Sequence, residues 1–236
     1  MKSKFVEDLK KTDRDGIDQL LEFLEEIGFY EKPASINHHL NKTGGLLEHT
    51  VNVKNEYLKL NEESGAEIPW ENIVIQASLH DLEKCFAYTS EMQHTITEGQ
   101  NNFLKSLANN NINLYNKYKI SKHVKDKNFI ISKEYASDLI GWFKNGEDIE
   151  PPAVEDTWNY NQDNLPVNHS MRSIMEASRF IELEERDNLA ILYHMGPYSN
   201  LDEKKRSKAI ELYPDVKLLH LADLTATTKE DIEEIK

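Results

Sequence analysis

Histidine and aspartate residues recur inside apolar stretches of this sequence. His49 follows a Gly-Gly-Leu-Leu-Glu run, the pair His80-Asp81 follows Leu79, and Asp223 lies among leucines and alanines. Buried imidazoles and carboxylates cost free energy unless they are paired, hydrogen-bonded or bound to metal. One such residue fits an ordinary core histidine, but several in comparable settings favour one shared polar site.

Mixed imidazole and carboxylate ligands suit divalent metals such as Zn, Mn, Fe, Co or Ni, and Mg is retained as a further candidate. A metal with an open coordination position lowers the pKa of a bound water toward neutrality, which makes that water a nucleophile for phosphorus. The sequence therefore predicts one or two divalent metal ions as cofactors. Cys85, the single cysteine, has no context that indicates a reactive thiol.

The elements that would carry these residues are helical. Apolar residues repeat at intervals of three and four over 15–27, 46–61, 69–84 and, after His169, over 171–181, 189–195 and 214–224. Gly28 and the Gly196-Pro197 pair end two of these helices. We therefore predict an all-α fold, with His49, the His80-Asp81 pair and Asp223 on three different helices.

The segment 86–168 has a different composition. It is rich in asparagine and lysine, its apolar periodicity is weak, and prolines interrupt it. We interpret residues 1–236 as one domain in which 86–168 is an insertion or lid, while a surface excursion without a role remains the alternative.

Composition limits the classes of partner. Twenty-eight basic and forty-two acidic residues give a formal charge of −14, which argues against a broad nucleic-acid surface. No apolar run has the length of a membrane span, and residues 1–11 lack the apolar stretch of a secretory signal. With one cysteine, a reducing compartment fits best, so we expect a soluble, cytoplasmic protein. The composition leaves homo-oligomer formation open.

At these residues the sequence resembles the HD superfamily of metal-dependent phosphohydrolases. That family has a histidine, a later His-Asp pair and a final aspartate on a C-terminal helix, which correspond here to His49, His80-Asp81 and Asp223. The resemblance spans about 37–228, with the middle segment poorly matched. It implies a helical bundle in which His49, His80, Asp81 and Asp223 bind the metal, and it implies hydrolysis of a phosphate ester.

Two more histidines resemble those of the family branch with additional site residues. The resemblance implies that His169 and His194 bind a second metal or contact the scissile phosphate, whereas capping or packing of a helix is the alternative. Many family members have glycine where this chain has Glu83. We interpret Glu83 as a solvated residue at a helix end, with general acid-base chemistry or support of a ligand as its alternative.

Further residues complete the expected site. Lys84 and Arg172 are predicted to compensate substrate charge. His220 lies three residues before Asp223, so we expect it to support the site rather than to bind metal. His38 and His39 resemble a pair in HD-containing 3′-5′ exoribonucleases, but the similarity is local. Aromatic residues that can stack on a base, or that serve only in packing, are Trp158, Tyr160 and Tyr198.

The leading prediction is a phosphohydrolase acting on a nucleotide or another small phosphate ester. Its catalytic residues would be Asp81, Lys84, His169, Arg172 and His194. One alternative is a phosphodiesterase or 3′-5′ exonuclease acting on short oligonucleotides or cyclic nucleotides. An alternative from another class is a catalytically inactive, metal-bound sensor or interaction module.

Overall fold

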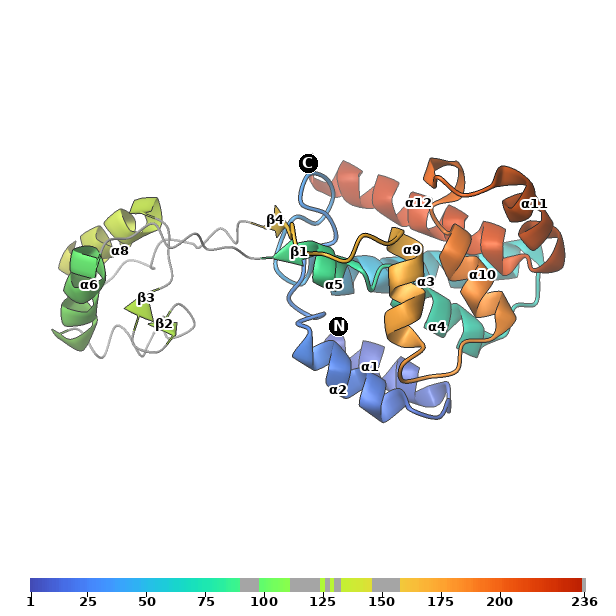
Figure 1. The fold of residues 1–236 in the computed structure, drawn as a ribbon, viewed down its shortest axis with the longest axis horizontal. Helices are drawn as coiled ribbons and strands as arrows, with labels where there is room; N and C mark the ends of the chain where they lie inside the picture. The colour runs from blue at the N-terminus through green and yellow to red at the C-terminus, as the bar shows by residue number, and fades with distance from the viewer. Residues whose placement is uncertain (90–97, 111–123, 126–127, 130–132, 146–157, 235–236) are drawn as a thin grey trace. The chain divides into compact units, whose positions relative to one another are not determined.

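The computed structural model describes residues 1–89, 98–110, 124–125, 128–129, 133–145 and 158–234. The chain divides into two compact units (Figure 1). The first unit combines residues 1–89 with 158–236, and the second comprises 90–157. Helices dominate the described residues, and the strands there have two residues each. The predicted all-α fold class is confirmed.

The first unit contains helices from both ends of the chain. Strand β1 (Tyr88–Thr89) pairs antiparallel with β4 (Asn159–Tyr160) where the chain leaves and re-enters the unit. The helices are α1 (Lys2–Lys11), α2 (Ile17–Glu26), α3 (Gly45–Ser64), α4 (Trp70–Leu79), α5 (Lys84–Ala87), α9 (His169–Ala177), α10 (Glu185–Tyr193), the 3-10 turn η2 (Gly196–Tyr198), α11 (Glu203–Leu212) and α12 (Asp215–Glu234).

In the second unit, α6 (Glu98–Asn110) packs on α8 (Lys133–Asn145), and strand β2 (Val124–Lys125) pairs with β3 (Asn128–Phe129). Buried apolar side chains of the two helices include Leu104, Leu139 and Trp142. The described part of the predicted 86–168 insertion includes these elements, and residues 90–97, 111–123, 126–127, 130–132 and 146–157 lie outside the described residues.

Helix α4 lies at the centre of the first unit. Residues 72–79 are all buried, as expected for a helix that other helices surround. Its Ile73 and Ala77 pack with α3 and α12, while Ile75 and Leu79 pack with α1, α2 and α9. Each of the long helices α3 and α12 has 20 residues, and the two also pack on each other. Side chains from these helices therefore converge near the end of α4.

A close backbone approach places the start of α3. A Cβ atom on Gly45 would lie 2.1 Å from the carbonyl oxygen of Leu40, and Gly44 has a φ of +81°. Only glycine fits these two positions without a shift of the backbone. The Gly44-Gly45 pair thus holds the first turn of α3, and with it His49, against the preceding loop.

Several predicted boundaries differ from the structure. The helix expected over 69–84 ends at Leu79, because residues 80–83 form turns in which the amide of Leu82 donates to Leu79 and that of Lys84 donates to Asp81. The prediction that His80 and Asp81 lie within a helix is therefore wrong. Helices α1 and α11 were not predicted, because both are largely polar and α11 buries only Ala209.

None of the helices in the described ranges is both long and apolar enough to cross a bilayer.

A buried polar network joins the helices that carry the site. Gln76 of α4 donates from Nε2 to Asp187 of α10 at 3.0 Å and to Asp215 of α12 at 2.9 Å. The Tyr57 hydroxyl of α3 donates to the Gln76 carbonyl oxygen at 2.6 Å. Arg186 forms a bidentate pair with Asp215. Each buried carboxylate thus has a partner, and the network fixes α4 relative to α3, α10 and α12.

Replacing Gln76 tests this network. Gln76→Ala removes a donor from two buried carboxylates and leaves a cavity, so we expect a loss of about 2–4 kcal/mol in the free energy of unfolding. Urea denaturation followed by circular dichroism measures this. The control is Gln19→Ala, an exposed glutamine of helix α2, which should change stability by less than about 0.5 kcal/mol. Equal stability of the two variants would contradict the role of the network.

Candidate functional site

Four imidazole rings surround the buried carboxylate of Asp81. The Nε2 atom of His49 lies 3.5 Å from Oδ2 and that of His80 lies 3.4 Å from the same oxygen. On the other side, His169 Nε2 lies 2.8 Å and His194 Nε2 lies 3.6 Å from Oδ1. Four segments separated in sequence thus direct the same ring atom toward one carboxylate.

The orientation of two of these rings follows from the ends of short helices. His80 follows α4 and His194 follows α10. In both, Nδ1 donates to the carbonyl oxygen three residues earlier, at 2.9 Å to Ala77 and at 2.7 Å to Ile191. Last-turn carbonyls lie where helical amide donors run out, so the rings supply a bond to them, and the Ile191 carbonyl also accepts from the His194 amide at 3.4 Å. The proton is held on Nδ1, and Nε2 points to Asp81.

In the other two rings, Nδ1 contacts a carboxylate. His49 Nδ1 lies 3.0 Å from Glu230 Oε2, and His169 Nδ1 lies 2.8 Å from Glu83 Oε2. Such a carboxylate fixes the ring of a metal-binding histidine and raises its basicity. Glu83 is buried and also accepts a hydrogen bond from Asn164 at 2.6 Å. The interpretation of Glu83 as a solvated residue is therefore wrong.

Asp223, the fourth predicted core residue, lies beside these rings. We refer to Asp81, Asp223 and the four histidines His49, His80, His169 and His194 as the cluster. Asp223 of α12 places Oδ1 3.2 Å from His49 Nε2. Its side chain is 19% exposed, and that of His169 is 26% exposed, whereas His49, His80 and His194 are nearly inaccessible. The accessible side of the cluster is therefore the side of Asp223 and His169.

The two predicted cationic residues differ in their surroundings. Lys84 places Nζ 2.5 Å from Asp81 Oδ2, so it lies at the cluster. Arg172 pairs with Glu176 at 2.8 Å, and its guanidinium lies 4.6 Å from the centre of the Phe86 ring. The cluster thus has a lysine beside its central carboxylate, while the contacts of Arg172 are with residues outside it.

The unpaired ring nitrogens test whether these residues fit a metal. The Nε2 atoms of His49, His80 and His194 are buried and form no hydrogen bond. A buried polar atom without a partner is costly, and a divalent cation is a ligand that would satisfy an imidazole lone pair. Nitrogen and carboxylate oxygen are the donors that borderline metals prefer. The residues therefore fit a metal ion.

Asp81 belongs to two adjacent groups of potential ligands. One group is His49, His80 and Asp81, and the other is Asp81, His169 and His194. In each group the donor atoms lie within 4.8 Å of one another. Because the first group contacts Oδ2 and the second Oδ1, Asp81 can serve both. Each of the two groups therefore has the donor atoms that could hold a metal ion.

Neighbouring charges shift the pKa values of the side chains in the cluster. Burial by itself would lower the pKa of His49, but the carboxylates of Asp223 and Glu230 raise it to about 9. Burial is likewise outweighed at His169, where Asp81 and Glu83 raise the pKa to about 9. Burial also opposes the ionisation of Asp81, yet Lys84 and the imidazoles hold its pKa well below the ordinary value. Without metal, the carboxylates are therefore neutralised by protonated imidazoles.

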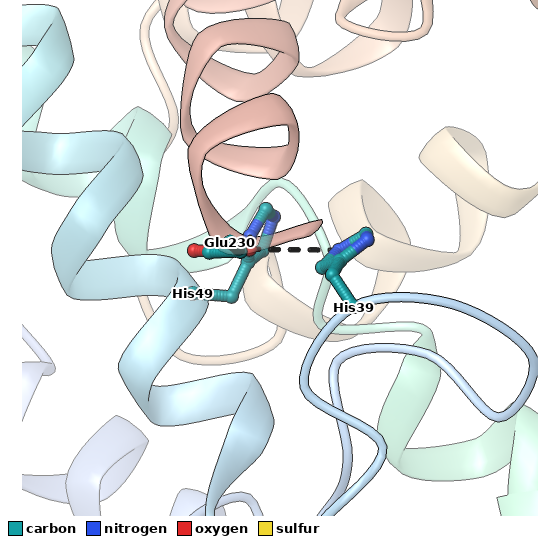
Figure 2. Close-up of side chains that lie close together, drawn as sticks. All are labelled: His39, His49 and Glu230. Atoms are coloured by element: carbon teal, nitrogen blue, oxygen red, sulfur yellow. Dashed lines mark hydrogen bonds and ion pairs between the residues drawn. The ribbon is translucent and has the colours of Figure 1, made fainter. Parts of the chain in front are cut away.

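A further group of potential ligands lies next to the site and was not identified from the sequence. His39, His49 and Glu230 have ring and carboxylate atoms close together (Figure 2). The one signal for His39 was its place before the two glycines, and Glu230 lies in a polar stretch with no distinguishing pattern. His220 was expected to support the site, and its Nδ1 donates to the carbonyl oxygen of His194 at 2.7 Å.

The aromatic residues considered for base stacking are largely surface residues. Tyr198 is 77% exposed and Tyr160 is 56% exposed. Trp158 is partly buried, and the Nζ atom of Lys32 lies 5.2 Å from the centre of its ring. Stacking on a substrate base stays a prediction for all three.

Comparison with curated proteins finds a partial relative. Over 66 residues, this chain is 42% identical to the dihydroneopterin 2′,3′-cyclic phosphate phosphodiesterase of Methanocaldococcus jannaschii. The similarity covers 26% of this chain and 26% of that protein, so it extends over about a quarter of the relative's length. No protein-family model matches the chain, and no solved structure is detectably similar.

The ionisation of His169 gives a test of this geometry. In protein stripped of metal by a chelator, the His169 ring should titrate near pH 9, against about 6.5 in the unfolded chain. A raised folded-state pKa means that the pairing stabilises the fold fully below about pH 6.5, and that this contribution is lost as the pH rises through about 9. NMR titration of the ring protons measures the pKa.

The matched variants for this titration are Glu83→Gln and Glu182→Gln. The first removes one of the two carboxylates that contact His169, so it should lower the His169 pKa. Glu182 is exposed, and its replacement should leave that pKa unchanged. A His169 ring that titrates near 6.5 in the stripped wild type would show that it does not lie between Asp81 and Glu83.

Proposed function

We propose that this protein is a metal-dependent phosphohydrolase that acts on a small phosphate ester. The observation that carries this proposal is the arrangement of four imidazoles that direct Nε2 toward the buried Asp81 carboxylate. Three of these Nε2 atoms form no hydrogen bond. A purely structural core would leave these atoms without partners. The presence of all four core ligands and of both additional histidines favours an active enzyme over a metal-bound sensor or interaction module that has lost catalysis.

We assign the metal ligands from the two groups around Asp81 and add Asp223, which lies 3.2 Å from His49 Nε2. His49, His80, Asp81 and Asp223 would hold one ion, and Asp81, His169 and His194 would hold a second. When bound, a divalent metal of the Mn, Fe, Co, Ni, Zn or Mg class supplies a water of lowered pKa and offsets phosphate charge. Lys84 adds a fixed positive charge beside the same carboxylate, and His169 is the accessible imidazole that substrate can reach.

In the reaction, a water oxygen forms a bond to phosphorus while the ester P–O bond breaks. The water gives up a proton, and the leaving oxygen takes one to become an alcohol, which stays attached to the product when the ester is cyclic. The roles of this chain's residues are to orient the phosphate at the Asp223 and His169 side and to offset its negative charge. Arg172 would contribute there only if its pairing with Glu176 were exchanged for substrate, and we retain it as a candidate on that condition.

The substrate class follows from charge and from the partial relative. A formal charge of −14 disfavours a long polyanion, so a nucleotide or a comparable small ester is the leading candidate. The curated relative is named for a cyclic phosphate diester, which favours a 2′,3′-cyclic phosphate as the second candidate. We place the protein in the cytoplasm and treat 86–168 as an insertion within one domain, 1–236.

A substrate panel separates these candidates. We expect metal-loaded protein to hydrolyse either nucleoside monophosphates or 2′,3′-cyclic nucleotides, and to act more slowly on labelled short oligonucleotides. Product formation is measured by chromatography after loading with each divalent metal in turn. Preference for oligonucleotides would favour the exonuclease alternative. Metal binding without hydrolysis of any member would favour the sensor.

The central carboxylate is tested by Asp81→Asn. This variant keeps the shape of the side chain but removes the charge that both ligand groups share. We expect loss of bound metal and a fall in turnover of at least about 10³-fold, with the fold retained. Metal content and turnover are measured together. The control is Asp163→Asn, which neutralises an exposed aspartate. Unchanged metal stoichiometry in Asp81→Asn would overturn the assignment.

His194→Ala distinguishes the second ligand group from the first. His194 contacts Oδ1 of Asp81 and not the oxygen on the His49 and His80 side. We expect the first ion to stay bound and turnover to fall by about 10²-fold, the effect of losing a positioned acid-base or electrostatic group. Wild-type turnover on the preferred substrate would mean that His194 only packs the end of α10.

A further inference from the structure

Glu230 forms a buried contact with Nδ1 of His49, the ring nitrogen that does not face Asp81. The residue lies near the end of α12 and is 4% exposed. Its Oε2 accepts from His49 Nδ1 at 3.0 Å, and its Oε1 accepts from Asn52 Nδ2 at 2.8 Å. Asn52 lies three residues after His49 and therefore on the same face of α3. Both oxygens of this carboxylate are thus engaged by one helix.

His39 covers the same carboxylate from the loop before α3 (Figure 2). Its Nε2 lies 3.8 Å from Glu230 Oε2, and its ring centre lies 5.1 Å from that of His49. His39 is 8% exposed, and neither of its ring nitrogens forms a hydrogen bond. It therefore excludes water from Glu230 without competing for the oxygen that His49 uses.

We propose that Glu230 is a positioning residue that keeps the proton of His49 on Nδ1, so that the lone pair of Nε2 faces Asp81 and Asp223. This inference rests on the proposed metal site. The geometry supports it because Nε2 of His49 lies 3.2 Å from Asp223 while Nδ1 lies on Glu230. A carboxylate in this place acts on the metal through the histidine and has no contact with substrate.

The hydrogen-bond partners of the Glu230 carboxylate determine the effect of replacing it with an amide. A carboxylate only accepts, so it fits both the Asn52 amide and the His49 Nδ1–H. In Glu230→Gln, one end of the side chain becomes a donor. If the Asn52 amide keeps the carbonyl end, the new NH₂ group faces His49 and favours the other tautomer, in which Nε2 carries the proton and cannot bind metal.

The test measures the dissociation constant for zinc by competition with a chelating dye. Relative to wild type, Glu230→Gln should bind zinc about 10–100-fold more weakly. The control is Asp231→Asn, which neutralises the neighbouring carboxylate. The Asp231 side chain is 50% exposed and lies 4.0 Å from His39 rather than on His49, so zinc affinity should change less than twofold. Circular dichroism and thermal unfolding show whether both variants fold alike.

A second substitution provides a rescue that a merely structural role would not give. When Asn52→Asp is combined with Glu230→Gln, the carboxylate introduced at position 52 can only accept. It therefore binds the NH₂ group introduced at position 230 and leaves the amide carbonyl oxygen for His49 Nδ1–H. Zinc affinity should return to within about fivefold of wild type. In zinc-loaded protein, ¹⁵N NMR of the His49 ring should show the proton on Nδ1 in wild type and in the double variant.

The outcomes distinguish the two proposals. Wild-type protein that binds no divalent metal would overturn both. Wild-type affinity in Glu230→Gln would overturn the positioning role of Glu230 alone and leave the proposed function intact. A weakened single variant that the second substitution does not rescue would also overturn this role, because charge or folding would then explain the loss.

Discussion

The burial of Asp81 is the constraint on which the site depends. A carboxylate that is only 5% exposed has lost nearly all of its hydration, and that cost must be offset by nearby positive charge or hydrogen bonds. Lys84 supplies one cation, and the imidazoles supply the remaining contacts. Because these groups come from α3, α10 and the segments around α4 and α9, the helices must converge at one point. Apolar side chains pack α3 and α12 around α4, and this packing brings the polar groups of the site together.

Hydrogen bonds at helix ends determine the orientation of two of the histidine rings. His80 and His194 use Nδ1 to satisfy carbonyls of the last turn, which is a capping role, and the same bond aims Nε2 at Asp81. The alternatives considered for His194, namely a cap or a site residue, are therefore compatible in one side chain. The two rings without a carbonyl, His49 and His169, depend on carboxylates instead. Such pairing makes them more basic, so proton release should accompany metal binding at these positions.

Local sequence indicated the central residues but not their support. His49, His80 and Asp223 stood out because polar residues in apolar stretches need partners, and a periodic pattern placed them on separate elements. Glu230 gave no such signal, and support of a ligand by Glu83 was only the alternative interpretation, since a glutamate near a helix end is usually solvated. Their burial arises from segments far apart in sequence, Asn164 and His169 on Glu83 and α3 on Glu230. The end of α4 at Leu79 was also missed, because turn bonds over 79–84 and the bond from the Glu83 amide to the Ser173 hydroxyl take the place of further helical bonds.

The distribution of exposure within the cluster bears on the choice of substrate. Asp223 and His169 are the accessible members, while His49, His80 and His194 lie behind them. A phosphate group that approaches there meets a carboxylate as well as an imidazole, and the protein as a whole is acidic. Repulsion between that carboxylate and phosphate must be offset locally, which a divalent cation does and a distant lysine does not. Under the proposed function, charge compensation at the site, rather than a basic surface, would allow an acidic protein to accept a small anionic substrate.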